Sequence, residues 1–142
     1  MKIYIELANK VVDEYCREMG VDRQLLYKNK YKKKMRRDEN GINLAFIRQS
    51  LAYYIYKRLP LTARNVGLIV GYTEHSMVSY YSRIIENHFE VQDPYFLPYY
   101  QQLEKVADPI VGEINFERVS AYWWKQVDKK SYKIRSTKQF SV

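Results

Sequence analysis

The chain has 142 residues, with 24 Lys and Arg against 16 Asp and Glu, and a formal charge of +8 at pH 7. Its hydrophobic fraction of 46% is enough to bury the core of one domain, or of one domain with an appendage, and argues against wholesale disorder. No apolar run approaches the roughly 18 residues of a membrane span, and Glu6 precedes any hydrophobic signal region. The single Cys16 excludes an internal disulfide. We therefore expect a reducing, cytoplasmic compartment.

The net positive charge lies in two short segments. The basic run, residues 28–37 (KNKYKKKMRR), holds seven basic and no acidic residues, and the basic tail, residues 125–142, holds six basic residues against Asp128. The rest of the chain is slightly acidic. A run of like charges is tolerated in a solvated loop and is stabilised beside phosphate. The basic run is therefore either a solubilising surface loop or a contact for a polyanion such as DNA.

The first predicted elements are two helices that precede the basic run. Apolar residues recur at every fourth position over residues 3–19, and Gly20 follows them, where helices commonly end in a left-handed conformation. Asp22 is suited to cap a short second helix that runs to Tyr27. After the basic run, residues 38–41 predict a turn.

A longer third helix is predicted from its N-cap, Asn43, to Leu59, and Pro60 stops it. One apolar stripe runs along its length, so we expect this helix to be the long strut of the core. The stripe consists of Ile47, Leu51, Tyr54, Ile55 and Leu59.

Two further helices form a helix-turn-helix pattern. Thr62 caps a short fourth helix that contains Val66, Ile69 and Val70, and Gly71 ends it. A polar stretch, residues 73–76, opens a fifth helix. The apolar stripe of that helix consists of Val78, Tyr81, Ile85 and Phe89, with Ile84 beside it. The predicted fold class is therefore all-α, a small helical bundle with a helix-turn-helix over residues 1–90.

Residues 91–142 are expected to form an aromatic and basic C-terminal extension. Prolines argue against a regular helix before Pro98, and Gln101–Val106 is predicted as a short helix that ends at Asp108 and Pro109. The segment from Phe116 to Val127 fits a helix or a strand. The basic tail is interpreted as a second DNA-contacting arm, a disordered tail, or a segment that docks on a protein partner.

The segment from Arg48 to Glu86 carries a family resemblance. Its matching features are Arg48-Gln49 at the start of the long helix, Thr62 as a cap, Val66-Gly67 and Gly71, followed by residues 74–76, Val78, Arg83 and residues 85–86. In these positions the chain resembles the C-terminal DNA-binding domain of the bacterial replication initiator DnaA, a helix-turn-helix domain related to the Trp repressor. With the upstream helices and basic run, the resemblance covers about residues 3–90. It implies double-stranded DNA as the partner.

The resemblance places base contacts at the start of the fifth helix. The chain keeps the family's Gly71, His75 and Ser76, and has Glu74 in place of an Asp. At the family's second Gly, its Arg and its second Thr it has Tyr72, Thr73 and Met77, which removes the guanidinium best suited to read guanine. Candidate base contacts are Thr73, Glu74, His75, Ser76, Met77, Ser79 and Tyr80.

Two of these candidates have alternative roles. Glu74 either caps the helix start or accepts a hydrogen bond from cytosine N4. His75 either contacts a base or a phosphate or is a surface histidine without a task.

Cationic side chains elsewhere are expected to hold the phosphate backbone or the minor groove. The resemblance implies that an Arg of the basic run enters the minor groove, and both Arg36 and Arg37 are candidates. Arg48, like Lys57, Arg58 and Arg64, is either a phosphate contact or a solvated charge. The full set of candidates is Lys28, Lys30, Lys32, Lys33, Lys34, Arg36, Arg37, Arg48 and Arg83.

The sequence offers no constellation for catalysis. It lacks a GxxxxGK[ST] phosphate loop, so the ATPase module of the full initiator is missing, and Cys16, His75 and His88 make no metal-ligand set. We expect no enzyme activity and no cofactor.

The leading hypothesis is a sequence-specific double-stranded DNA-binding protein of transcriptional control or replication, from a bacterial cell, a phage or a mobile element. The rival hypothesis is a structural or interaction protein of a nucleoprotein or virion assembly. In that protein the helix-turn-helix would be a scaffold, and residues 91–142 would bind a protein partner.

Overall fold

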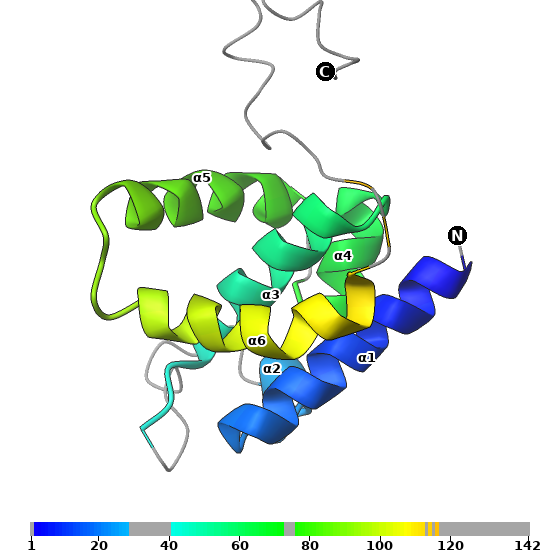
Figure 1. Ribbon diagram of the computed structural model, residues 1–142, viewed down its shortest axis with the longest axis horizontal. Coiled ribbons are helices and arrows are strands. Elements are labelled where there is room, and N and C mark those ends of the chain that lie inside the picture. The colour runs from blue at the N-terminus through cyan, green and yellow to red at the C-terminus, as the bar shows by residue number, and fades with distance from the viewer. Residues whose placement is uncertain (1, 29–40, 73–75, 113, 115, 117–142) are drawn as a thin grey trace, which may run out of the picture.

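The computed structural model describes residues 2–28, 41–72, 76–112, 114 and 116. Within these residues the fold is all-α, as predicted, with six helices and no strand (Figure 1). The helices are α1 (Lys2–Met19), α2 (Leu25–Lys28), α3 (Leu44–Arg58), α4 (Ala63–Val70), α5 (Ser76–Glu90) and α6 (Leu97–Val111). No helix of the described residues is long and apolar enough to cross a membrane.

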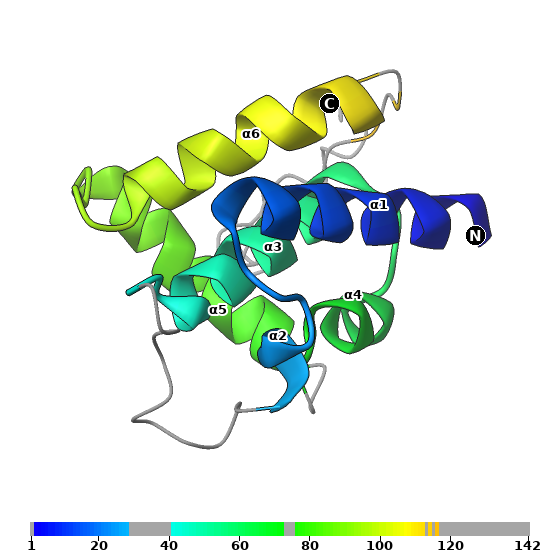
Figure 2. The same cartoon turned by 90° about the horizontal axis from the view of Figure 1, so that it is seen from below.

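The third helix, α3, is the centre of the bundle. Helices α2, α4, α5 and α6 all pack against it, while α1 packs along α6 (Figures 1 and 2). The predicted apolar stripe of α3 is buried throughout, and Ser50, Ala52 and Tyr53 are buried as well. A helix that is buried nearly all round needs partners on every side, and here the other helices supply them.

The predicted caps at Gly20, Asn43 and Thr62 are confirmed. The side-chain oxygen of Asn43 accepts from the backbone N–H of Phe46 at 3.2 Å, and that of Thr62 accepts from Asn65 at 3.1 Å. Gly20 adopts a left-handed φ of +71°, as expected for the residue after α1. These local signals set the lengths of α1, α3 and α4.

The sixth helix corrects the prediction of a short helix over Gln101–Val106, while the predictions for residues 117–142, including the basic tail, lie outside the described residues. Instead of a short helix over Gln101–Val106, α6 spans 15 residues from Leu97 to Val111. Pro98 stands in its first turn, where no backbone N–H is needed, and Pro109 stands in its last turn, where it removes only one helical hydrogen bond. The helix buries Tyr100, Leu103, Ala107 and Val111 in the same core as α1 and α3.

Hydrogen bonds also tie α6 into the bundle. The Tyr15 hydroxyl of α1 donates to the Tyr99 carbonyl at 2.7 Å, and the Tyr99 hydroxyl accepts from the backbone N–H of Asn43 at 2.9 Å. Both contacts join residues far apart in sequence. The core therefore continues past the boundary predicted after residue 90.

An aromatic corner closes the bundle between α5 and α6. His88 stacks on Phe96 with ring centroids 4.7 Å apart, and its Nδ1 lies 2.8 Å from Oδ2 of Asp93. A backbone hydrogen bond from Tyr95, aided by His88, holds the pKa of Asp93 below its usual range. This corner sets the reversal of chain direction from α5 to α6, visible in Figure 1.

Candidate nucleic-acid interface

The helix-turn-helix is formed by α4 and α5. Gly71 follows α4 with a left-handed φ of +99°, and its N–H donates to the Gly67 carbonyl at 2.9 Å. Val66 and Val70 of α4 and Val78 of α5 are fully buried. These contacts fix the two helices on α3, with α5 starting at Ser76.

The turn at Gly71 lies directly against α2. A Cβ atom at this position would stand 2.6 Å from the Leu26 carbonyl oxygen and 3.1 Å from Cδ1 of the Tyr27 ring. A side chain here would collide with backbone atoms, which cannot rotate away. Two features of this position therefore require glycine, and these are the positive φ and the close approach of α2.

The same Leu26 carbonyl accepts a hydrogen bond from Nε of Arg48 at 3.0 Å. Arg48 is only 9% exposed, so the expectation of a solvated charge at this position is wrong. Its side chain extends from the first part of α3 toward α2 and satisfies the Leu26 carbonyl of α2, the atom that lies against Gly71. Through this hydrogen bond Arg48 helps to hold α2 against the turn at Gly71.

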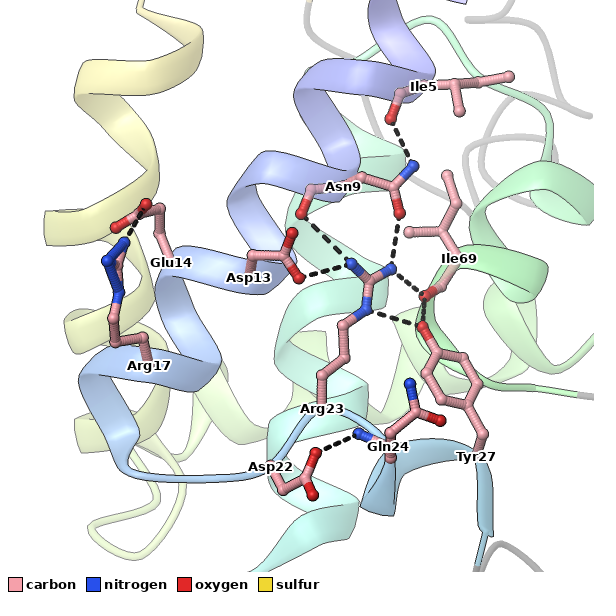
Figure 3. A network of polar contacts seen from close by, with 10 residues as sticks. All are labelled: Ile5, Asn9, Asp13, Glu14, Arg17, Asp22, Arg23, Gln24, Tyr27 and Ile69. Atoms are coloured by element: carbon pink, nitrogen blue, oxygen red, sulfur yellow. Dashed lines mark hydrogen bonds and ion pairs between the residues drawn. The ribbon is translucent and has the colours of Figure 1, made fainter.

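A polar network joins α1, α2 and the end of α4 (Figure 3). The Tyr27 hydroxyl donates to the Ile69 carbonyl at 2.5 Å, and a guanidinium N–H of Arg23 donates to the same oxygen at 3.2 Å. Arg23 also pairs with Asp13 at 2.8 Å and with the Asn9 side chain at 2.6 Å. The Ile69 carbonyl lies in the last turn of α4, where carbonyls lack helical donors.

We call Arg23, Tyr27 and the Ile69 carbonyl the clamp. Sequence patterns do not reveal the clamp, because its partners lie 42 and 46 residues apart and follow no helical period. The one signal in the sequence is a spacing. Arg23 and Tyr27 stand four residues apart, the distance at which two side chains on a helical turn meet.

The clamp determines where the basic run leaves the described fold. The run starts at Lys28, immediately after Tyr27, so its first residue lies beside the turn that precedes α5. The structure thus brings the start of the basic run next to the helix-turn-helix. Its other predicted contacts, Lys30, Lys32, Lys33, Lys34, Arg36 and Arg37, lie outside the described residues.

The predicted base contacts fall at and before the start of α5. Thr73, Glu74 and His75 lie outside the described residues. The backbones of Ser76, Met77, Ser79 and Tyr80 form the first turns of α5. The backbone N–H groups of a first helical turn have no helical acceptors, and they favour an anion such as a phosphate.

The remaining predicted cations divide into two groups. Arg83 of α5 and Arg64 of α4 are exposed on the two motif helices. Lys57 and Arg58 lie instead at the end of α3 against α6, where Arg58 pairs with Asp108 at 3.3 Å. Only the first group lies on the two helices of the motif.

The described part of the chain contains no group of three or more His, Cys, Asp or Glu residues that could hold a metal ion. Cys16 is buried in α1, and desolvation raises the pKa of its thiol to about 11. The thiol is therefore protonated at neutral pH.

Comparisons of the chain with protein-family models, with curated proteins and with solved structures give no match. The function is therefore inferred from the geometry and chemistry of the helix-turn-helix and its surroundings.

Proposed function

We propose that the protein binds double-stranded DNA with sequence preference and acts in transcriptional control or DNA replication. The observation that carries the proposal is the contact between Gly71 and Leu26, reinforced by the clamp. It places Lys28, the first residue of the basic run, directly after the residues of α2 that contact Gly71 and the Ile69 carbonyl, which precede α5. The basic run, proposed to bind phosphate, and α5, proposed to read bases, thus begin close to each other.

The second motif helix supplies the part that reads sequence. A helix of this kind enters the major groove with its N-terminal residues toward the bases, and the groove is wide enough to admit it. Ser76, Met77, Ser79 and Tyr80 offer hydroxyl and apolar groups at the start of α5. Hydroxyl groups donate to or accept from several base edges, and Met contacts a thymine methyl.

The basic run supplies most of the affinity. Within α5, Arg83 is the one Lys or Arg residue, so the motif helix itself attracts phosphate weakly. Each phosphate that the run neutralises adds about 0.9 to the slope of log affinity against log salt concentration. Binding should therefore weaken steeply as salt is added.

The test is a selection of bound sites from a random DNA pool, followed by fluorescence anisotropy with the selected duplex and a scrambled duplex over a salt series. We expect salt-dependent binding to both duplexes and tighter binding to the selected one. Absence of binding at low salt would refute the proposal and favour the assembly-protein hypothesis. Equal affinity for both duplexes would refute the sequence preference alone.

A further inference from the structure

The start of α3, which follows the basic run, is held by a side chain of α6. Gly41 is the first described residue after the run, and Asn43 stands two positions further on as the N-cap of α3. The backbone N–H of Asn43 donates to the Tyr99 hydroxyl at 2.9 Å, a contact across 56 residues. The position at which the chain enters α3 therefore depends on α6, a helix outside the residues that carry the family resemblance.

The Tyr99 hydroxyl fills a place that α3 leaves open at its own cap. In a capping box, a Glu or Gln at the third helical position accepts from the backbone N–H of the N-cap residue. In α3 that position is Phe46, which has no acceptor in its side chain. The other groups of Asn43 are used within α3, since its carbonyl accepts from Ile47 at 3.1 Å and its side chain accepts from Phe46 at 3.2 Å. The acceptor for the Asn43 N–H comes instead from α6.

Two further contacts hold Tyr99 in place. Its ring packs edge to face on the ring of Phe46, with centroids 5.3 Å apart. Its backbone carbonyl accepts from the Tyr15 hydroxyl of α1 at 2.7 Å. Tyr99 is thus fixed by α1 and α3, so its hydroxyl presents an acceptor in a set direction to Asn43.

The hydrogen bonds that flank the basic run lie toward opposite ends of α5. Before the run, Tyr27 contacts the last turn of α4, the helix that precedes α5. After the run, the Phe46 ring that packs on Tyr99 also lies against the ring of His88, in the last turn of α5, with centroids 5.9 Å apart. A helix of 15 residues is about 22 Å long. The two fixed points therefore stand at either end of the helix that we propose to read bases.

We propose that Tyr99 is a positioning residue for DNA binding, which fixes the second end of the basic run relative to α5. This inference rests on the proposed function and assigns α6 to the DNA-binding unit. Fixing a segment before it binds reduces the freedom that binding has to remove, and so raises affinity. Tyr99 adds no charge, so it changes affinity without changing the number of phosphates that the run neutralises.

Fluorescence anisotropy with the selected duplex over a salt series tests this role in Tyr99→Phe, which keeps the ring and removes the hydroxyl. We expect the affinity to fall about five-fold, the effect of one hydrogen bond, with an unchanged salt slope because every cation remains. The matched control is Tyr15→Phe, which removes the hydroxyl that donates to the Tyr99 carbonyl and leaves the Asn43 contact in place. It should lower the urea midpoint by a similar amount and leave the affinity unchanged.

Amide hydrogen exchange tests the contact in the absence of DNA. The Asn43 amide should exchange about five-fold faster in Tyr99→Phe than in the native chain or in Tyr15→Phe. Circular dichroism checks that both variants are folded at the temperature of the titrations.

Four outcomes would overturn the proposal while DNA binding itself stands. These are native affinity in Tyr99→Phe, an equal loss of affinity in Tyr15→Phe, a lowered salt slope in Tyr99→Phe, and unchanged exchange of the Asn43 amide. A native chain that binds no duplex would instead overturn the proposed function, and this inference with it.

Discussion

Two corners of the molecule are stabilised by different means. The corner between α2 and α4 depends on directed polar contacts, in which Tyr27 and Arg23 converge on one carbonyl and Arg48 satisfies another. The corner between α5 and α6 depends mainly on ring packing around Phe96 and His88, with the contact of His88 with Asp93 beside it. Ring packing tolerates small shifts, whereas a hydrogen bond to one carbonyl fixes a direction. The polar corner is the one from which the basic run departs.

The largest expected effect on stability follows from removing the ring of Phe96, which lies at the centre of the aromatic corner. Phe96→Ala should lower the free energy of unfolding by about 3–5 kcal/mol, because the side chain is fully buried between α5 and α6. The matched control is Tyr95→Ala, since Tyr95 is 79% exposed and should cost little. Urea denaturation measures both. Similar losses for the two variants would show that the corner does not stabilise the fold.

Gly71→Ala should cost about 3 kcal/mol, from the left-handed φ together with the collision against the Leu26 carbonyl. Gly20→Ala separates the two causes, because Gly20 also has a positive φ and a Cβ there meets nothing within 4 Å. We expect it to lose about 1 kcal/mol. Equal losses in urea denaturation would contradict the close approach of α2 to the turn.

Neutralising the basic run should weaken DNA binding without changing sequence preference. Replacing Lys32, Lys33 and Lys34 with Gln should lower the salt slope by up to about 2.7, the sum for three phosphates, and weaken all duplexes about equally. His75→Ala or Ser76→Ala should instead alter the preference between the selected and scrambled duplexes. Anisotropy titrations over a salt series measure both quantities. A changed preference with an intact salt slope in the triple variant would reverse these assigned roles.

Disrupting the clamp should lower the DNA sequence preference, because the clamp positions the start of the basic run. Tyr27→Phe removes the hydroxyl that donates to the Ile69 carbonyl and accepts from Arg23, and should cost about 1 kcal/mol of stability. We also expect the preference for the selected duplex to fall, because the start of the basic run loses its fixed direction. Tyr95→Phe is the control, with an exposed ring. Unchanged preference in Tyr27→Phe would mean that the clamp serves stability alone.

The smallest expected effect is on pH dependence. Because the pKa of Asp93 is held below its usual range, the stability that it contributes is present above its unfolded pKa of about 3.9 and is lost as the pH falls through its lower folded pKa. Asp93→Asn should therefore reduce the difference in urea midpoint between pH 6 and pH 3. An unchanged difference would show that other groups cause the acid sensitivity.

Local signals predict the helix-turn-helix half of the molecule well, and the failures have two causes, a long-range contact of Arg48 and the position of two prolines in α6. Asn43, Thr62 and Gly71 act on residues within a few positions of themselves, so the sequence alone indicates what they do. Arg48 was misjudged because its acceptor belongs to Leu26, 22 residues away. The length of α6 was underestimated because Pro98 and Pro109 were interpreted as breaks, although both stand in terminal turns.

The candidate site was predictable only in part. The position of α5 followed from Gly71 and from the apolar stripe of the helix. The start of the basic run close to the turn could not be predicted, because it depends on long-range contacts of Leu26 and Tyr27 with Gly71 and the Ile69 carbonyl. Sequence patterns thus indicate which residues could contact DNA, whereas tertiary contacts determine that the basic run and α5 begin close to each other.

A long-range hydrogen bond stands on either side of the basic run. Tyr27 is bonded to α4 before the run, and the backbone of Asn43 is bonded to Tyr99 of α6 after it. Both hydrogen bonds are made by residues outside 29–40, so we expect substitutions of the cations between them to change DNA affinity while the free energy of unfolding of the bundle stays nearly unchanged.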